Sequence, residues 1–289
     1  MLDANELFYE EEGIGESETI IFLHPKVMGS WVWKYQRRFF KGYDCIYLDL
    51  PNHGHSKCDD TFSIKNATEV IKDFILIKTK PKFKWDKVNL VGIGTGGLIA
   101  FELLCDYPEL LDKVVVSGVS TPLPEMLENR EDAMVNIFDY SKYFYENKTM
   151  RFIASSHMAI YGISKRNSSN MKFSLENISP DTVKDAGYEA MNYIIPPVKD
   201  SGKGKDLLLA YGSKDERVVT YSSYEFHKAF PLATCIRIDK GLHMWNMLMS
   251  DLFNEIVYDF IKEGKIKDYD NVIKEENIGW VFFVWLILD

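Results

Sequence analysis

The feature that most restricts the fold is a glycine-dense turn between an apolar run and a helical stretch. Residues 87–93 are apolar enough for a buried strand, and residues 95–106 have the composition of a helix. The junction between them carries glycine at positions 92, 94, 96 and 97. Glycine lets two backbones approach closely and accepts positive φ angles that other residues resist. The pattern therefore predicts a strand, a sharp turn and a helix packed tightly together.

Two other kinds of turn also use several glycines. One is an ordinary tight turn, and the other is a loop that cradles phosphate. The dinucleotide-binding fingerprint places glycines in the order G-x-G-x-x-G within the first βα unit of a fold. This run reads G-x-G-x-G-G, and two strand-like runs precede it. The spacing therefore disfavours a dinucleotide site, whereas an ordinary turn stays open.

Strand-like and helix-like runs alternate along the whole chain. Near-continuous apolar runs are typical of strands buried on both faces, and they occupy 19–24, 44–50, 87–93, 113–119, 206–212 and 234–240. Helical patterns lie between them, at about 34–42, 66–79, 95–106, 218–229 and 246–263. Residues 6–12 add an expected edge strand. This alternation predicts an α/β fold with a mostly parallel sheet flanked by helices.

One long interval interrupts the alternation, between the runs 113–119 and 206–212. A loop of that length without structure of its own would be unusual in a compact domain. The interval contains a helix start at 179–181, where proline takes the first helical position. We expect residues 122–200 to form a helical insertion. Its many Met, Phe and Tyr side chains suit either a lid over a pocket or plain core packing.

Composition and charge narrow the class of protein. The chain of 289 residues has 46% hydrophobic residues and a formal net charge of −9, which is ordinary for a globular protein and unfavourable for binding nucleic acid. The N-terminal residues show neither the basic nor the apolar region of a signal peptide. The four cysteines lack metal-ligand spacing. We therefore expect a cytoplasmic protein with reduced thiols, no transmembrane segment and no nucleic-acid partner.

Chemically useful side chains follow several of the expected strands. The run 19–24 continues into His24-Pro25-Lys26, and the run 44–50 leads into the polar, glycine-containing segment 51–56. Asp215 follows the run 206–212, and His243 follows the run 234–240. Ligands of parallel sheets bind at the carboxyl ends of the strands, so these residues are expected near the glycine turn.

Taken in order, these motifs resemble the α/β-hydrolase fold family, and most closely its capped group of esterases, epoxide hydrolases and lactonases. That family carries its nucleophile on a sharp strand-to-helix turn with the pattern small-x-nucleophile-x-small. With Gly92 and Gly96 as the small residues, Gly94 stands at the nucleophile position. The resemblance implies a mostly parallel eight-stranded sheet flanked by helices, with a helical cap inserted after strand six.

The resemblance also implies domain boundaries. Residues 1–121 and 201–266 correspond to the hydrolase core, and residues 122–200 correspond to the cap. Residues 267–289 form a tail outside the family pattern and end in the apolar run 280–288. Such a run is too short to span a bilayer, which needs about 20 residues. We expect it to pack on the body of this chain, across a homodimer interface or on another partner.

For the site, the resemblance implies Asp215 as the acid and His243 as the base of a catalytic triad. It implies the backbone N–H groups of Lys26 and Thr95 as the oxyanion hole. Simpler roles stay open. Asp215 also suits the N-cap of the following helix. If Asp215 is not the acid, Glu216 is the second candidate. A single histidine is often only a satisfied surface or core residue.

Gly94 leaves three functions open, because glycine has no side chain that can attack a substrate and Thr95 stands one residue too late. The first is a serine-type hydrolase of small esters, lactones or amides that is weak or inactive with glycine at position 94, natively or after an inactivating change. The second is a non-catalytic ligand-binding or scaffold pseudo-hydrolase. The third is a lyase or hydrolase in which His243 activates water or the substrate. All three predict a small, largely apolar ligand, with no cofactor or metal.

Overall fold

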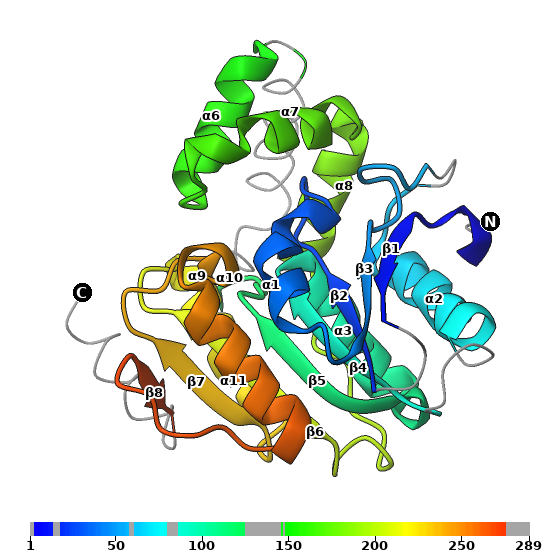
Figure 1. Ribbon diagram of the computed structural model, residues 1–289, viewed down its shortest axis with the longest axis vertical. Coiled ribbons are helices and arrows are strands. Elements are labelled where there is room, and N and C mark those ends of the chain that lie inside the picture. The colour runs from blue at the N-terminus through cyan, green and yellow to red at the C-terminus, as the bar shows by residue number, and fades with distance from the viewer. Residues whose placement is uncertain are drawn as a thin grey trace.

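The computed structural model describes residues 3–13, 18–57, 61–79, 86–124, 146 and 148–275. Within these ranges, eight strands form one sheet in the order β1-β3-β2-β4-β5-β6-β7-β8 (Figure 1). The inner strands are parallel, while β1 and β8 run antiparallel to their neighbours at the two edges. The strands are β1 (Tyr9–Glu12), β2 (Thr19–Leu23), β3 (Asp44–Leu48), β4 (Val88–Ile93), β5 (Leu111–Ser117), β6 (Asp206–Gly212), β7 (Thr234–Ile238) and β8 (Val272–Lys274).

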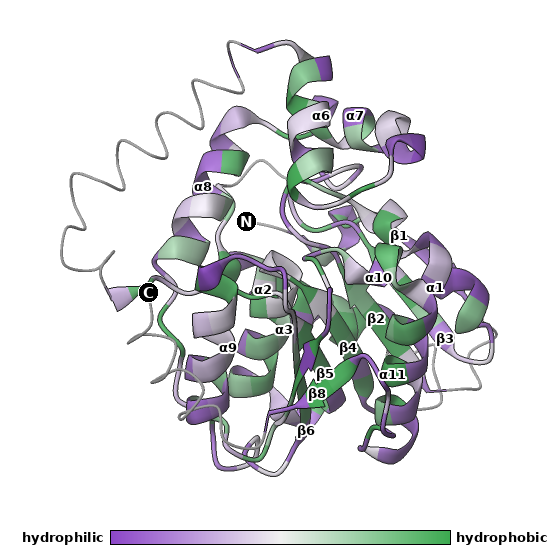
Figure 2. Ribbon diagram, turned by 90° about the vertical axis from the view of Figure 1, so that its left-hand side faces the viewer, coloured by the Kyte–Doolittle hydropathy of each residue, from purple (hydrophilic) through white to green (hydrophobic). Residues whose placement is uncertain are grey.

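Helices cover both faces of the sheet. The helices α2 (Ile64–Phe74), α3 (Thr95–Asp106) and α9 (Arg217–Ala229) cover one face, and α1 (Lys34–Phe39) and α11 (Ser250–Glu263) cover the other (Figure 1). The shorter α10 (Trp245–Leu248) precedes α11. In Figure 2 the strands are mostly green, whereas the outer helices carry purple segments. This is the distribution expected when each helix buries one apolar stripe against a sheet.

Local sequence explains where these helices begin and end. In α2 the buried side chains recur at Ile64, Ala67, Ile71 and Phe74, which is helical spacing. The helix begins at Ser63, whose hydroxyl accepts a hydrogen bond from the Asn66 N–H at 3.0 Å. A π-helical turn, Ile75–Thr79, extends it. At its other end α11 stops at Gly264, which has the left-handed φ of 68° that favours glycine there.

Among the described residues between β5 and β6 lie the α-helices α6 (Met150–Ile160), α7 (Ser168–Glu176) and α8 (Pro180–Met191). They confirm helical structure in this interval, and Ser179 caps α8 by accepting a hydrogen bond from the Thr182 N–H at 3.0 Å. These helices follow β5, the fifth strand in chain order, whereas the insertion was predicted after strand six. Counted along this chain, the predicted position is one strand too late. The predicted insertion also includes residues 125–145 and 147, which lie outside the described residues.

The insertion is joined to the core by hydrogen bonds. The Trp31 indole N–H donates to Ser174 Oγ in α7 at 2.8 Å, and the Ile64 N–H donates to Glu189 Oε2 in α8 at 3.1 Å. In both views α6 and α7 lie beyond the carboxyl ends of the parallel strands (Figures 1 and 2). These helices therefore lie at the edge of the sheet where ligands of α/β folds bind.

The sheet agrees with the predicted α/β class, and its last strand comes from an unexpected place. Strand β8 lies within the tail expected to fall outside the family pattern, and it pairs with β7 through Ile238 and Val272. The apolar run 280–288 lies outside the described residues. In the part of the chain that is described, no helix combines the length and apolar composition of a membrane span.

Candidate active site

The glycine turn is a sharp junction between β4 and α3. Gly94 is the N-cap of α3, with φ 55° and ψ −122°, a conformation that strongly favours glycine. A Cβ added at Gly92 would lie 2.3 Å from the carbonyl oxygen of Gly96, and one at Gly96 would lie 2.3 Å from that of Leu23. The small residues are therefore required by the close approach of β4, α3 and β2, which confirms the predicted strand, turn and helix.

Backbone hydrogen bonds continue across the strand ends at this edge of the sheet. The Gly94 N–H donates to the Ser117 carbonyl at 2.9 Å, and the Gly118 N–H donates to the Ala210 carbonyl at 3.0 Å. These bonds hold the ends of β4, β5 and β6 in register. The residues that follow each strand are therefore presented from a rigid base rather than from long loops.

Asp215 follows β6 in a tight turn. Its Oδ2 accepts a hydrogen bond from the Gly212 N–H at 2.8 Å, and its side chain is buried. Burial is the largest cause that raises the pKa of Asp215 to about 6, with a further contribution from the neighbouring carboxylate of Glu216. Glu216, not Asp215, is the N-cap of α9. The alternative in which Asp215 serves as that N-cap is therefore wrong.

His243 follows β7 and faces Asp215. Its Nδ1 lies 3.8 Å from Asp215 Oδ1, which is longer than a hydrogen bond and within the looser range seen in sites without a ligand. Burial, and then the positive charge of Lys26, lower the pKa of His243 to about 4. The pKa of Asp215, about 6, and that of His243, about 4, both lie below 7, so neutral pH gives a neutral imidazole beside an ionised carboxylate.

Neighbouring side chains fix the position of the His243 ring. The Trp245 indole N–H donates to Ser117 Oγ at 2.9 Å and so ties this segment to the end of β5. Tyr161, which follows α6, covers the imidazole with ring centroids 5.2 Å apart. On the opposite side the ring lies against Gly118, where an added Cβ would be 2.9 Å from Nδ1.

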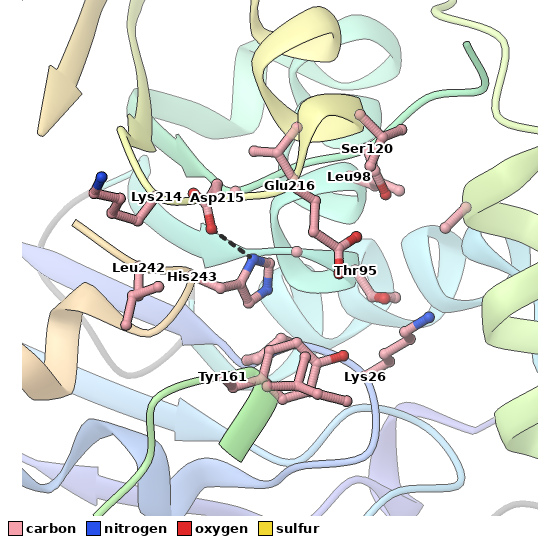
Figure 3. A pocket seen from close by; sticks show the side chains of 17 residues that line it. Lys26, Thr95, Leu98, Ser120, Tyr161, Lys214, Asp215, Glu216, Leu242 and His243 are labelled. Atoms are coloured by element: carbon pink, nitrogen blue, oxygen red, sulfur yellow. Dashed lines mark ion pairs between the residues drawn. The ribbon is translucent and has the colours of Figure 1, made fainter. Parts of the chain in front are cut away.

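The structure brings Gly94 to the free side of the same ring. A Cβ built on Gly94 would lie 3.2 Å from His243 Nε2 and 3.1 Å from Pro25 Cβ. The three positions predicted to form one site therefore converge, with Gly94 at Nε2 and Asp215 at Nδ1 of the imidazole. Figure 3 shows the His243 and Asp215 side chains pointing toward each other across the pocket.

The segment that carries Lys26 is held by a buried histidine. His24 Nε2 accepts a hydrogen bond from the Leu50 N–H at 2.9 Å, so the ring proton is on Nδ1, which donates to the Pro25 carbonyl at 2.8 Å. Because a trans peptide directs its N–H away from its C=O, this bond also fixes the direction of the Lys26 N–H. Thr95 is the first residue of α3, so its N–H has no acceptor within the helix.

Lys26, Gly94, Thr95, Asp215 and His243 all line one cavity of about 130 Å³. The insertion closes it from outside with Ile160, Tyr161 and Ala190, and apolar walls come from residues such as Leu98 and Val218. The lining is mixed rather than apolar, because the charged side chains of Lys26 and Glu216 also face the cavity (Figure 3).

The sequence did not identify two features of this cavity. Tyr161 is one of the Tyr residues of the expected insertion, and its place over His243 depends on how the insertion folds back. For Lys26 the resemblance implied a role of the backbone N–H only, whereas the structure also places its side chain in the lining of the cavity. Within the described ranges no group of three or more His, Cys, Asp or Glu residues could hold a metal ion.

Comparison with known proteins identifies the family. The family model described as the alpha/beta hydrolase fold matches residues 18–248. This range covers most of the chain and includes β2, the glycine turn, Asp215 and His243. The chain therefore belongs to the α/β-hydrolase fold family.

Several curated proteins are similar in sequence. The chain is 24% identical to Serine hydrolase BPHL of Homo sapiens, over 89% of this chain and 83% of that protein. It is 28% identical to Epoxide hydrolase 1 of Caenorhabditis elegans, over 49% of this chain and 35% of that protein. It is 32% identical to 2-succinyl-6-hydroxy-2,4-cyclohexadiene-1-carboxylate synthase of Escherichia coli O1:K1 / APEC, over 34% of this chain and 37% of that protein. The match spans little more than a third of the last two relatives.

Solved structures show the same fold at lower identity. A bromoperoxidase from Bacillus anthracis has a TM-score of 0.72 at 19% identity, with 91% of this chain and 99% of that chain covered. The enol-lactonase from Burkholderia xenovorans LB400 has a TM-score of 0.67 at 15% identity, with 89% of this chain and 96% of that chain covered. These likenesses support the eight-stranded α/β architecture and carry no conclusion about substrate.

Proposed function

We propose that this chain is a serine-type hydrolase scaffold for small esters, lactones or amides that lacks its nucleophile, and that it is weak or inactive with glycine at position 94. The observation that carries the proposal is the 3.2 Å distance from a Cβ built on Gly94 to His243 Nε2. A serine there would place its hydroxyl beside the neutral nitrogen of the imidazole, which is the arrangement a general base needs.

The other roles follow from the same geometry. His243 would take the proton of the attacking hydroxyl and pass it to the leaving group, and Asp215 would orient the imidazole and stabilise its positive form. The N–H groups of Lys26 and Thr95 are the proposed donors to the developing oxyanion. The insertion helices would act as the cap, since Ile160, Tyr161 and Ala190 close the cavity.

The domain assignment is part of this proposal. Residues 1–121 and 201–266 would form the core and 122–200 the cap, as the sequence predicts. Strand β8 adds residues 272–274 to the core sheet, so we place the end of the core after this strand. The apolar end of the tail, and a homodimer formed through it, stay predictions.

A second candidate function is supported by one feature, the open space beside His243 Nε2. Without a side chain at Gly94, the cavity of about 130 Å³ exceeds the roughly 10–15 Å³ that one water needs. His243 could then activate water, or a proton of the substrate, without a covalent intermediate. The low pKa of His243, about 4, keeps its nitrogen free to accept that proton at neutral pH.

The test is hydrolysis of p-nitrophenyl butyrate by the unchanged protein, Gly94→Ser and Gly94→Ala. We expect Gly94→Ser to raise the rate at least about 100-fold, since loss of one triad member usually lowers kcat by several orders of magnitude. Gly94→Ala introduces the same Cβ without a hydroxyl and should stay at the level of the unchanged protein. Adding His243→Ala to Gly94→Ser should remove the gain.

Pro25 calls for one more variant, because its Cβ would lie 3.1 Å from the new Cβ. Gly94→Ser combined with Pro25→Gly removes this contact. If both the single and the double variant fold and neither cleaves the ester, the hydrolase proposal is refuted and a non-catalytic binding protein is favoured. If the unchanged protein cleaves the ester and needs His243, the second candidate is favoured instead.

A further inference from the structure

The cavity contains a cation that lacks a partner. Lys26 makes neither a hydrogen bond nor an ion pair within 4.0 Å among the residues that the structure describes. By contrast, Lys72, Lys113 and Lys267 each pair with a carboxylate, at 2.9, 2.7 and 2.7 Å. Burial lowers the pKa of Lys26, and the more distant carboxylate of Glu216 only partly opposes this. An ammonium group removed from water without a counterion is unfavourable unless a ligand supplies the charge.

We infer that the cavity binds a small molecule with a carboxylate group, and that the Lys26 side chain selects it. This inference deepens the proposed function. It rests on that proposal only because both assign a role to the same cavity. Binding of the carboxylate requires neither a nucleophile nor turnover. The two ideas can therefore fail separately.

Besides Asp215, the lining carries two other charged side chains, Lys214 and Glu216, and neither competes for this role. Lys214 is exposed, lies on the Asp215 side of the pocket and directs its ammonium away from His243 (Figure 3). Glu216 is also exposed, at the N-terminus of α9, where the helix stabilises its negative charge. Lys26 lies on the other side of the cavity from Lys214 and is only half-buried, so it is both desolvated and accessible.

Two further features support an anionic ligand. Thr95 brings the N-terminus of α3 to the same cavity, and the positive end of a helix dipole favours a negative charge. The volume of about 130 Å³ is close to that of a cavity of roughly 150 Å³ that holds benzene, a molecule of about six heavy atoms. Butyrate has this size and carries the carboxylate at one end.

The experiment measures binding of butyrate and of butyramide to the unchanged protein by isothermal titration calorimetry. The two molecules have the same shape, and they differ in charge. We expect butyrate to bind at least about 10-fold more tightly, the ratio typical of a hydrogen bond to a charged group. Lys26→Met should remove this preference, and Lys26→Arg should keep it.

Lys214→Met is the matched control, because it removes a lysine of the same lining whose ammonium points away. It should leave the preference for butyrate unchanged. Equal affinity for the two molecules, no detectable binding of butyrate, or a preference that survives Lys26→Met in a variant with the urea midpoint of the unchanged protein would each overturn the inference. Ester cleavage by Gly94→Ser without any carboxylate preference would overturn this inference and leave the proposed function standing.

Discussion

Replacement of Gly94 by alanine should measure how much strain a nucleophile side chain would impose on this turn. The φ of 55° and ψ of −122° lie in a region that costs a residue with a side chain about 1–3 kcal/mol. The new Cβ would also lie 3.1 Å from Pro25 Cβ and 3.2 Å from His243 Nε2, and overpacking of this kind costs about 1 kcal/mol or more. Together these terms predict a loss of roughly 2–4 kcal/mol in the free energy of unfolding.

Urea denaturation followed by tryptophan fluorescence measures this loss. With an m-value of about 3 kcal/mol/M, the midpoint should fall by roughly 1 M. Gly42→Ala is the control, because a Cβ at Gly42 meets nothing within 4 Å. Combining Gly94→Ala with His243→Ala should recover only the part due to the imidazole contact. If Gly94→Ala is within about 0.5 kcal/mol of Gly42→Ala, the turn is not strained and the reasoning is wrong.

Two further predictions concern buried carboxylates. Asp215 has its pKa raised from 3.8 to about 6, so folding favours its protonated form and its charge lowers stability as pH rises through this window. The free energy of unfolding of Asp215→Asn should therefore exceed that of the unchanged protein by on the order of 1–3 kcal/mol at about pH 8. The difference should shrink toward pH 4. An Asp215→Asn variant that is less stable than the unchanged protein at about pH 8 would contradict this. Glu275 accepts hydrogen bonds from Arg237 at 2.9 Å and Tyr211 at 3.1 Å, so Glu275→Ala should lower the free energy of unfolding by about 1–3 kcal/mol. Lys274→Ala, which breaks an exposed pair with Asp268 and a long hydrogen bond of 3.5 Å to the Ile266 carbonyl, should change it by less than about 1 kcal/mol, and equal effects of the two would contradict a buried role for Glu275.

Much of the core could be predicted because its strands carry a strong apolar signal. The run 206–212 coincides with β6, and the run 19–24 extends β2 by one residue. The convergence of Asp215 and His243 followed from topology alone, since the carboxyl ends of parallel strands meet at one edge. Strand β8 could not be predicted, because Val272–Lys274 is too short for any periodicity and forms only by pairing with the edge of β7.

The parts of the site that sequence could not give depend on tertiary packing. Tyr161 covers His243 because the insertion folds back over the sheet. No local sequence pattern predicts this packing of the insertion on the core. The direction of a long side chain is equally hidden in sequence. The sequence predicted a role for the Lys26 backbone N–H, and only the structure shows that the side chain lines the cavity without a partner among the described residues.

The energetics of the site argue for chemistry rather than for packing. Burial disfavours the charged forms of both Asp215 and His243, and at 3.8 Å their contact is too long to offset this as a hydrogen bond. A core built only for stability would replace two such groups by apolar residues. Buried titratable pairs in a cavity are instead typical of functional sites. Gly94 removes the strain that a side chain would impose on this turn, and in the proposed function it leaves His243 and Asp215 as the base and the acid of a site without a nucleophile.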